Sequence, residues 1–133
     1  MFQILLVDDD IEFLRGLGKA IRQHGYDVTE AADGREAMAR LREKLPDLIV
    51  TDINMPEMDG IEIINELRAR KTPVPVIAIS GGGRLPKELL LSSASILGAV
   101  ETIEKPFELA ALLVTIDRLL TGIPPEAPMP PAH

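Results

Sequence analysis

The sequence predicts an α/β fold, a (βα)5 arrangement in which a doubly wound, parallel five-stranded sheet carries helices on both faces. Three observations lead to this prediction. Short apolar runs recur along the chain, as expected of strands that are buried on both faces. Segments with the apolar spacing of amphipathic helices separate these runs. This alternation of strand and helix requires parallel strands that are joined by right-handed crossovers.

The expected strands comprise three clear apolar runs and two weaker ones. The clear runs are Ile4–Val7, Leu48–Val50 and Val74–Ile79. The weaker runs, Val28–Ala31 and Val100–Ile103, have polar or charged residues between their apolar ones.

The segments between the strands place apolar residues on one helical face. These faces are Ile11, Leu14, Leu17 and Ile21; Met38, Leu41 and Leu45; Ile61, Ile64 and Leu67; and Leu109, Leu112, Leu113, Ile116, Leu119 and Leu120. A further helix is expected around 87–97, where three serines weaken the helical propensity. Gly16 and Gly18 inside the first helix indicate a bend or a close contact there.

Local signals mark the expected helix starts. Asp10 directly precedes the first helix and is expected to cap it. The spacing of a capping box occurs twice, in Asp33 with Glu36 and in Asp59 with Glu62. Pro106 is expected at the first position of the last helix, where a missing N–H costs nothing.

The length of 133 residues predicts one compact domain with a short extension. From Ile123 the chain has five prolines in eleven residues, too many for a helix or a central strand. We therefore expect a domain over residues 1–121 and a disordered, proline-rich tail over 122–133, with a docking peptide as the alternative for the tail.

Composition excludes several classes of function. The chain has no cysteine, which rules out a disulfide scaffold, a thiolate zinc site and a cysteine nucleophile. A net charge of −7 with one tyrosine, three phenylalanines and no tryptophan argues against direct nucleic-acid binding. Apolar runs too short to span a bilayer and the lack of a basic signal segment predict a cytoplasmic protein without membrane insertion.

Polar residues follow four of the five expected strands. The first strand leads into Asp8, Asp9 and Asp10, the third ends at Asp52, the fourth at Ser80 and the fifth at Lys105. Each residue alone could be a helix cap or a solvated loop residue. Ligands of parallel sheets bind where the carboxyl ends of the strands meet, so the four strand ends together predict one site.

The expected site is strongly negative. Two carboxylates about 4 Å apart repel by about 4 kcal/mol at an effective dielectric constant of about 20. Asp8, Asp9 and Asp52 must therefore protonate, move apart or bind a cation, and carboxylates with water and an open face suit Mg²⁺. An oxygen of Asp52 could then attack a phosphoryl group, with Lys105 balancing the added charge and Ser80 donating a hydrogen bond.

These motifs together resemble a response-regulator receiver domain of two-component signalling, of the single-domain chemotaxis type. The resemblance covers residues 2–121 and is carried by Ile4–Asp9, Asp52–Gly60, Ile79–Gly81 and Lys105–Phe107. It implies a flavodoxin-like sheet of order 2-1-3-4-5. Because the matched segment leaves no room for an output domain, we expect a stand-alone regulator.

The resemblance also implies roles for individual residues. Asp52 is implied as the phosphoacceptor. Asp9 and Asp52 are implied as direct Mg²⁺ ligands, with the backbone carbonyl of Asn54 as a third and with Asp8 acting through water.

A second set of implied roles concerns the response to phosphorylation. Ser80 matches the hydroxyl that moves toward the phosphoryl group, and Lys105 matches the family's lysine, which often precedes a cis proline. Thr102 stands where the family usually has an aromatic switch residue, so coupling through such a ring is in doubt.

The implied reaction is self-catalysed transfer from a phosphohistidine, followed by slow hydrolysis, so the chain is not expected to be an enzyme with a separate substrate. The implied donor is a histidine kinase or a histidine phosphotransfer protein. The implied output surface is the fourth helix, fifth strand and fifth helix, where Leu89–Leu91 cannot all face the core. It would contact a downstream protein or, on phosphorylation, a second copy of the chain.

Two other interpretations stay open. One is a phosphorylation-independent interaction module of the same fold, which only Thr102 favours. The other is a phosphohydrolase with an aspartate nucleophile, but Ile53-Asn54-Met55 after Asp52 lacks the pattern of those enzymes.

Overall fold

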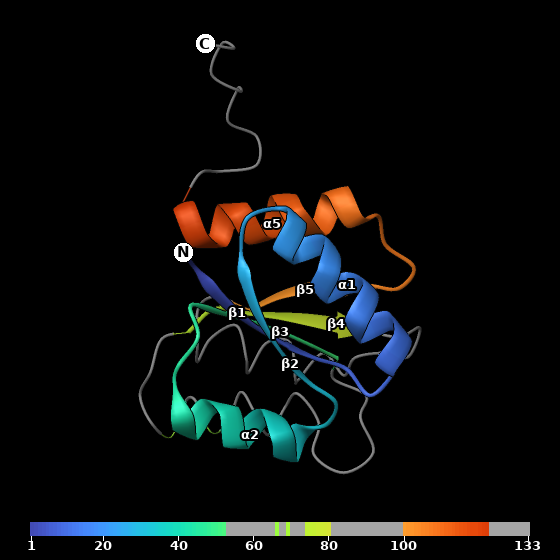
Figure 1. Ribbon diagram of the computed structural model, residues 1–133. Helices are drawn as coiled ribbons and strands as arrows, with labels where there is room; N and C mark the ends of the chain where they lie inside the picture. Colours follow the sequence, from blue (N-terminus) through green and yellow to red (C-terminus); the bar gives the residue numbers. More distant parts are fainter. Residues whose placement is uncertain (53–65, 67–68, 70–73, 81–99, 123–133) are drawn as a thin grey trace.

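A computed structural model of the chain describes residues 1–52, 66, 69, 74–80 and 100–122 (Figure 1). Its elements in chain order are β1 (Gln3–Val7), α1 (Ile11–Gln23), β2 (Asp27–Ala31), α2 (Gly34–Glu43), β3 (Leu48–Asp52), β4 (Val76–Ser80), β5 (Val100–Glu104) and α5 (Leu109–Thr121). The strands form one parallel sheet of order β2-β1-β3-β4-β5. Helices α1 and α5 cover one face and α2 the other, which confirms the predicted doubly wound architecture (Figure 1).

The core consists of two apolar layers, one on each face of the sheet. Strand β1 shows the alternation: Ile4 and Leu6 pack on the side of α1 and α5, whereas Leu5 and Val7 pack on the side of α2. All four side chains are buried. Burial on both faces explains why the clear strands are unbroken apolar runs.

The register of the strands determines what meets at their carboxyl edge. Val7 of β1 lies opposite Thr51 of β3, and Asp52 lies opposite Ile79 of β4. Ser80 in turn pairs with Glu104 of β5. The residues that follow these pairs therefore come from β1, β3, β4 and β5 to one edge of the sheet.

Side-chain caps fix the starts of α1 and α2 as predicted. Asp10 Oδ1 accepts a hydrogen bond from the Phe13 amide at 3.2 Å, and Asp33 Oδ1 accepts one from the Glu36 amide at 2.8 Å. Glu36 reaches back to accept from the Ala32 amide at 3.4 Å, one residue before the cap. Such caps satisfy amides that the first turn leaves without partners.

The prediction for Pro106 is wrong. Helix α5 begins at Leu109 with Glu108 as its N-cap, and Pro106 lies before it, after a cis Lys105–Pro106 peptide. The intervening Phe107 packs against Phe13 and the core instead of forming the first turn of the helix.

Three apolar residues predicted on helical core faces are instead exposed. Leu45 is 42% exposed and lies beyond the end of α2, where Pro46 disfavours a helical conformation for the preceding residue. Ile11 and Leu109 are each the first residue of a helix, and each is 41% exposed. A helical side chain leans toward the preceding turn, and at the first residue there is no such turn for it to cover.

A close contact accounts for one of the two glycines in α1, Gly18. An added Cβ would lie 2.7 Å from Glu30 Oε2 of β2, so the predicted close contact is confirmed there. Glu30 also pairs with Arg22 at 2.9 Å. At Gly16, by contrast, an added Cβ would meet no neighbouring group within 4 Å among the described residues.

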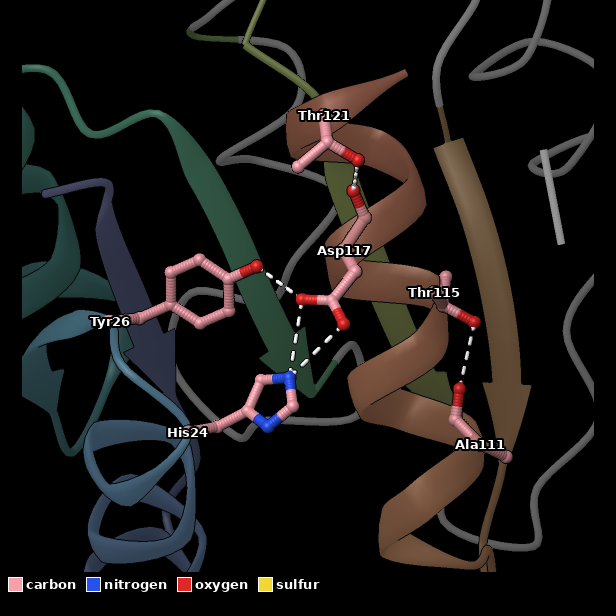
Figure 2. Close-up of polar contacts among 6 residues, drawn as sticks. All are labelled: His24, Tyr26, Ala111, Thr115, Asp117 and Thr121. Atoms are coloured by element: carbon pink, nitrogen blue, oxygen red, sulfur yellow. Dashed lines mark hydrogen bonds and ion pairs between the residues drawn. The ribbon is translucent and has the colours of Figure 1, made fainter. Parts of the chain in front are cut away.

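Polar contacts join α5 to the turn between α1 and β2 (Figure 2). The carboxylate of Asp117 accepts hydrogen bonds from the Tyr26 hydroxyl and from His24 Nε2, the latter at 3.1 Å. Burial, followed by the bond and charge of Asp117, raises the pKa of Tyr26 to about 12. The next residue of α5, Arg118, pairs with Glu101 of β5.

Several predictions fall outside the described residues. They are the helices containing Ile61, Ile64 and Leu67 and residues 87–97, the pair Asp59 and Glu62, the leucines 89–91 and the proline-rich tail. Among the described helices, none has both the length and the apolar character that a bilayer span requires.

Candidate phosphoryl-transfer site

Three carboxylates meet at the carboxyl edge of the sheet. Asp8 and Asp9 directly follow β1, and Asp52 ends β3. One oxygen from each residue lies within 4.8 Å of the others. Asp8 is 2% exposed and Asp52 6%, whereas Asp9 is open to solvent. The structure thus brings together the three acids that the sequence predicted to converge.

Asp8 is held by two hydrogen bonds. Its Oδ1 accepts a hydrogen bond from the Asp10 amide at 2.9 Å, and its Oδ2 accepts one from Lys105 Nζ at 3.2 Å. Burial raises the pKa of Asp8 above its usual value, against the lowering effects of the Asp10 amide and Lys105, and the charge of Asp52 adds to the rise. The local positive charge therefore does not fully offset the cost of keeping Asp8 ionised.

Lys105 supplies the positive side chain that the sequence predicted here. It directly follows β5, and its Nζ lies 3.2 Å from Asp8 Oδ2 and 3.8 Å from Asp52 Oδ2. Its side chain is 25% exposed, so a group that approaches from solvent can reach it. The ammonium is thus shared between two acids that come from different strands.

The donor set fits a hard divalent cation. Two charges no more than 4.8 Å apart repel by at least about 3.5 kcal/mol at an effective dielectric constant of about 20. With all groups ionised, Lys105 balances one of three negative charges. Mg²⁺ takes oxygen ligands, commonly one or two carboxylates together with water and phosphate oxygens, which matches an exposed Asp9 beside two buried acids.

The remaining predicted residues differ in how far the structure describes them. The backbone of Ser80 closes β4 at the same edge, opposite Glu104. Thr102 lies in β5 opposite Ala78 and is exposed. Asn54 lies outside the described residues.

The sequence analysis missed Phe13. This residue sits in the first turn of α1, and its ring centroid lies 4.3 Å from Lys105 Nζ. The ring also meets Phe107 edge-on, at 6.0 Å between centroids and 85° between planes. No local signal in the sequence indicates it, because the contact depends on the direction of α1 relative to the end of β5.

An apolar groove adjoins the site. It has a volume of about 590 Å³ and lies between the first half of α1 and the segment that leads into α5. Its lining includes Phe13, Gly16, Leu17, Lys105, Pro106 and Phe107. Lys105 therefore borders both the acidic site and the groove.

Comparison with known proteins agrees with this geometry. The family model for the response regulator receiver domain matches residues 4–117, which span every described strand and most of α5. The chain belongs to this family. The receiver's sheet order and its strand-end acids are thus both in place.

Individual relatives support the assignment. The receiver is 38% identical to the transcriptional regulatory protein PrrA of Mycobacterium tuberculosis over 118 residues. The matched segment covers 89% of this chain and 49% of PrrA. The chain therefore spans about half the length of the curated relatives that it matches first.

Solved structures show the same fold. The receiver domain of Francisella response regulator 1452 has a TM-score of 0.80 and 28% identity, over 92% of this chain and 98% of that one. The chemotaxis protein CheY4 of Vibrio cholerae has a TM-score of 0.78 and 32% identity, over 90% and 99% of the two chains.

Proposed function

We propose that this receiver accepts a phosphoryl group on Asp52 from a phosphohistidine, with Mg²⁺ bound at the acidic site. The observation that carries the proposal is the meeting of Asp8, Asp9 and Asp52 with Lys105 at one edge of the sheet. The proposed donor is a histidine kinase or a histidine phosphotransfer protein.

In the proposed reaction, a carboxylate oxygen of Asp52 forms a bond to phosphorus as the bond between phosphorus and the donor imidazole breaks. The products are an acyl phosphate on Asp52 and an imidazole that takes up a proton. Phosphoryl transfers of this kind depend on positioning and on charge neutralisation more than on covalent assistance. Bound Mg²⁺ would supply the neutralising charge, held by Asp9, Asp52 and the carbonyl of Asn54 directly and by Asp8 through water.

Lys105 has two tasks in this proposal. Before transfer, its ammonium lowers the repulsion between Asp8 and Asp52, from each of which it lies less than 4 Å away. After transfer, the phosphoryl group adds about −1.5 to −2 charge, and Lys105 binds one of its oxygens. Ser80 is proposed to donate a hydrogen bond to another oxygen.

The phosphorylated receiver is proposed to bind other proteins or to pass the phosphoryl group on. The only reactions that it is proposed to catalyse are its own phosphorylation and the hydrolysis of its own acyl phosphate. The proposed output surface includes β5 and α5, and a second copy of the chain is an alternative partner there. Stand-alone action, cytoplasmic location and the lack of direct nucleic-acid contact stay predictions. Since PrrA is a transcriptional regulator about twice as long, mobility-shift assays on the phosphorylated protein are the direct check of the last one.

Intact-mass measurement tests the phosphoacceptor. With Mg²⁺ and acetyl phosphate the wild type should gain one phosphoryl group, and chelation of the metal or Asp52→Asn should abolish the gain. Asp47→Asn is the matched control, since Asp47 accepts from the Gln3 amide at the other end of β1 and should leave labelling intact. A gain that persists in Asp52→Asn contradicts the assignment, and no gain in the wild type favours the phosphorylation-independent module.

A further inference from the structure

We propose that Phe13 is a positioning residue for Lys105, holding its ammonium at the acidic site through the face of its ring. The effect on phosphoryl transfer rests on the function proposed above, whereas the contact itself does not. Phe13 belongs to α1 and Lys105 follows β5, so the contact joins segments 92 residues apart in sequence, at the edge of the sheet where the acids meet.

The surroundings of Lys105 Nζ are of two kinds. Two carboxylate oxygens lie at 3.2 and 3.8 Å, and the centroid of the Phe13 ring lies at 4.3 Å. A lysine ammonium within about 6 Å of an aromatic centroid is attracted by the negative face of the ring. The attraction strengthens as the ammonium loses water, and the Lys105 side chain is three-quarters buried.

The ring is held in place from several directions. Phe13 lies in the turn that Asp10 caps, and the cap's hydrogen bond is made to the Phe13 amide itself. Phe107 meets the ring edge-on, and the half-buried Phe13 packs against the core beneath α1. A ring fixed in this way can orient a flexible neighbour, as a functional site requires of its supporting residues.

The reaction gives this contact its use. A lysine ammonium is a compact charge on a flexible four-carbon chain. Carboxylates alone therefore hold the ammonium close without fixing the conformation of that chain. When a phosphoryl oxygen arrives on Asp52, Lys105 must exchange one anionic partner for another. The ring is neutral and stays in place during this exchange, so it keeps the ammonium near Asp52 whichever anion is bound.

A double-mutant cycle separates this role from simple packing. Phe13→Leu keeps an apolar side chain and removes the aromatic face, and Phe13→Tyr restores the face. Lys105→Met removes the ammonium but keeps a long side chain. Each variant and the Phe13→Leu/Lys105→Met double variant are labelled with acetyl phosphate and Mg²⁺, and rate constants are followed by intact mass. Phe2→Leu is the control, since Phe2 contacts Tyr26 at the opposite end of β1.

Phe13→Leu should slow labelling about five-fold with Lys105 present and change it less than two-fold in the Lys105→Met background. Phe13→Tyr and Phe2→Leu should stay within two-fold of the wild type. An equal loss in both backgrounds, a wild-type rate in Phe13→Leu or a failure of Phe13→Tyr to restore the rate would overturn the proposal.

Unfolding equilibria of the wild type, Phe13→Leu, Lys105→Met and the double variant, without donor or metal, give a second readout that does not depend on phosphorylation. The two substitutions should be coupled by about five-fold in the unfolding equilibrium constant. If the wild type is not labelled, the proposed function fails, and this cycle alone decides on the contact. Additive effects would then show that the ring does not hold the ammonium.

Discussion

Asp8→Asn should make the metal-free protein more stable at pH 7. The substitution removes a buried negative charge, while its amide oxygen can still accept the hydrogen bond from the Asp10 amide. Burial of the Asp8 carboxylate is the main cost of its charge, and Asp52, whose oxygen lies within 4.8 Å, adds a repulsion of at least about 3.5 kcal/mol at an effective dielectric constant of about 20. Lys105 at 3.2 Å returns about 5 kcal/mol on the same scale.

Lys105 therefore offsets the repulsion by Asp52, and the cost that remains is that of removing the Asp8 charge from water. Because the raised pKa of Asp8 indicates that this cost outweighs the attraction by Lys105, we expect a gain of about 1–2 kcal/mol in the free energy of unfolding. The same change should weaken the stabilisation by Mg²⁺, because a ligand that binds the native state less tightly stabilises the fold less.

The pH dependence has a definite sign. The pKa of Asp8 is higher in the folded protein than its usual value of 3.8, so protonation of Asp8 favours the folded state. That stabilisation is complete below pH 3.8 and is lost as the pH rises through the raised pKa. The advantage of Asp8→Asn over the wild type should therefore be largest at pH 7 and should shrink toward pH 4.

Urea unfolding in chelator, at low ionic strength and at both pH values, measures this difference. Asp47→Asn, which removes an exposed charge far from the site, should change stability little at either pH. A less stable Asp8→Asn at pH 7, or a difference that does not vary with pH, would refute the electrostatic reasoning for the site.

Further predictions concern α1 and α5. Gly16→Ala should raise the free energy of unfolding by up to about 1 kcal/mol, whereas Gly18→Ala should raise it less, because its Cβ would lie 2.7 Å from Glu30 Oε2 and would displace the end of that side chain from its ion pair with Arg22; thermal unfolding compares the two. Tyr26 is the one tyrosine of the chain, so its ultraviolet titration should report a pKa of about 12, and Asp117→Asn should lower it. Because its folded pKa is raised, the stability from Tyr26 should persist below pH 10 and disappear as the pH rises toward 12.

The strands and the acidic site could be predicted from sequence because both follow from local patterns. Burial on both faces requires unbroken apolar residues, as in β1 and β3, and a parallel sheet brings its carboxyl ends to one edge. Because Asp8 and Asp9 follow one strand and Asp52 ends another, their side chains meet at that edge. The sheet order itself came from the family resemblance.

What escaped prediction depends on packing between distant segments. Before α5 begins, Phe107 packs against Phe13, a contact that no local signal near Pro106 records. The position of the Phe13 ring beside Lys105 requires the direction of α1 relative to the end of β5. Leu45 was misplaced for the opposite reason, since periodicity was followed past a neighbouring proline that ends the helix.

The order of the sheet also bears on how the protein avoids self-association. Its outer strands are β2 and β5, whose outward-facing amides and carbonyls could template strand pairing with another molecule. Each strand carries an exposed carboxylate, Asp27 on β2 and Glu104 on β5. Two such borders brought together would set like charges against each other, so the sheet's own margins discourage edge-to-edge aggregation in a chain that already bears a net charge of −7.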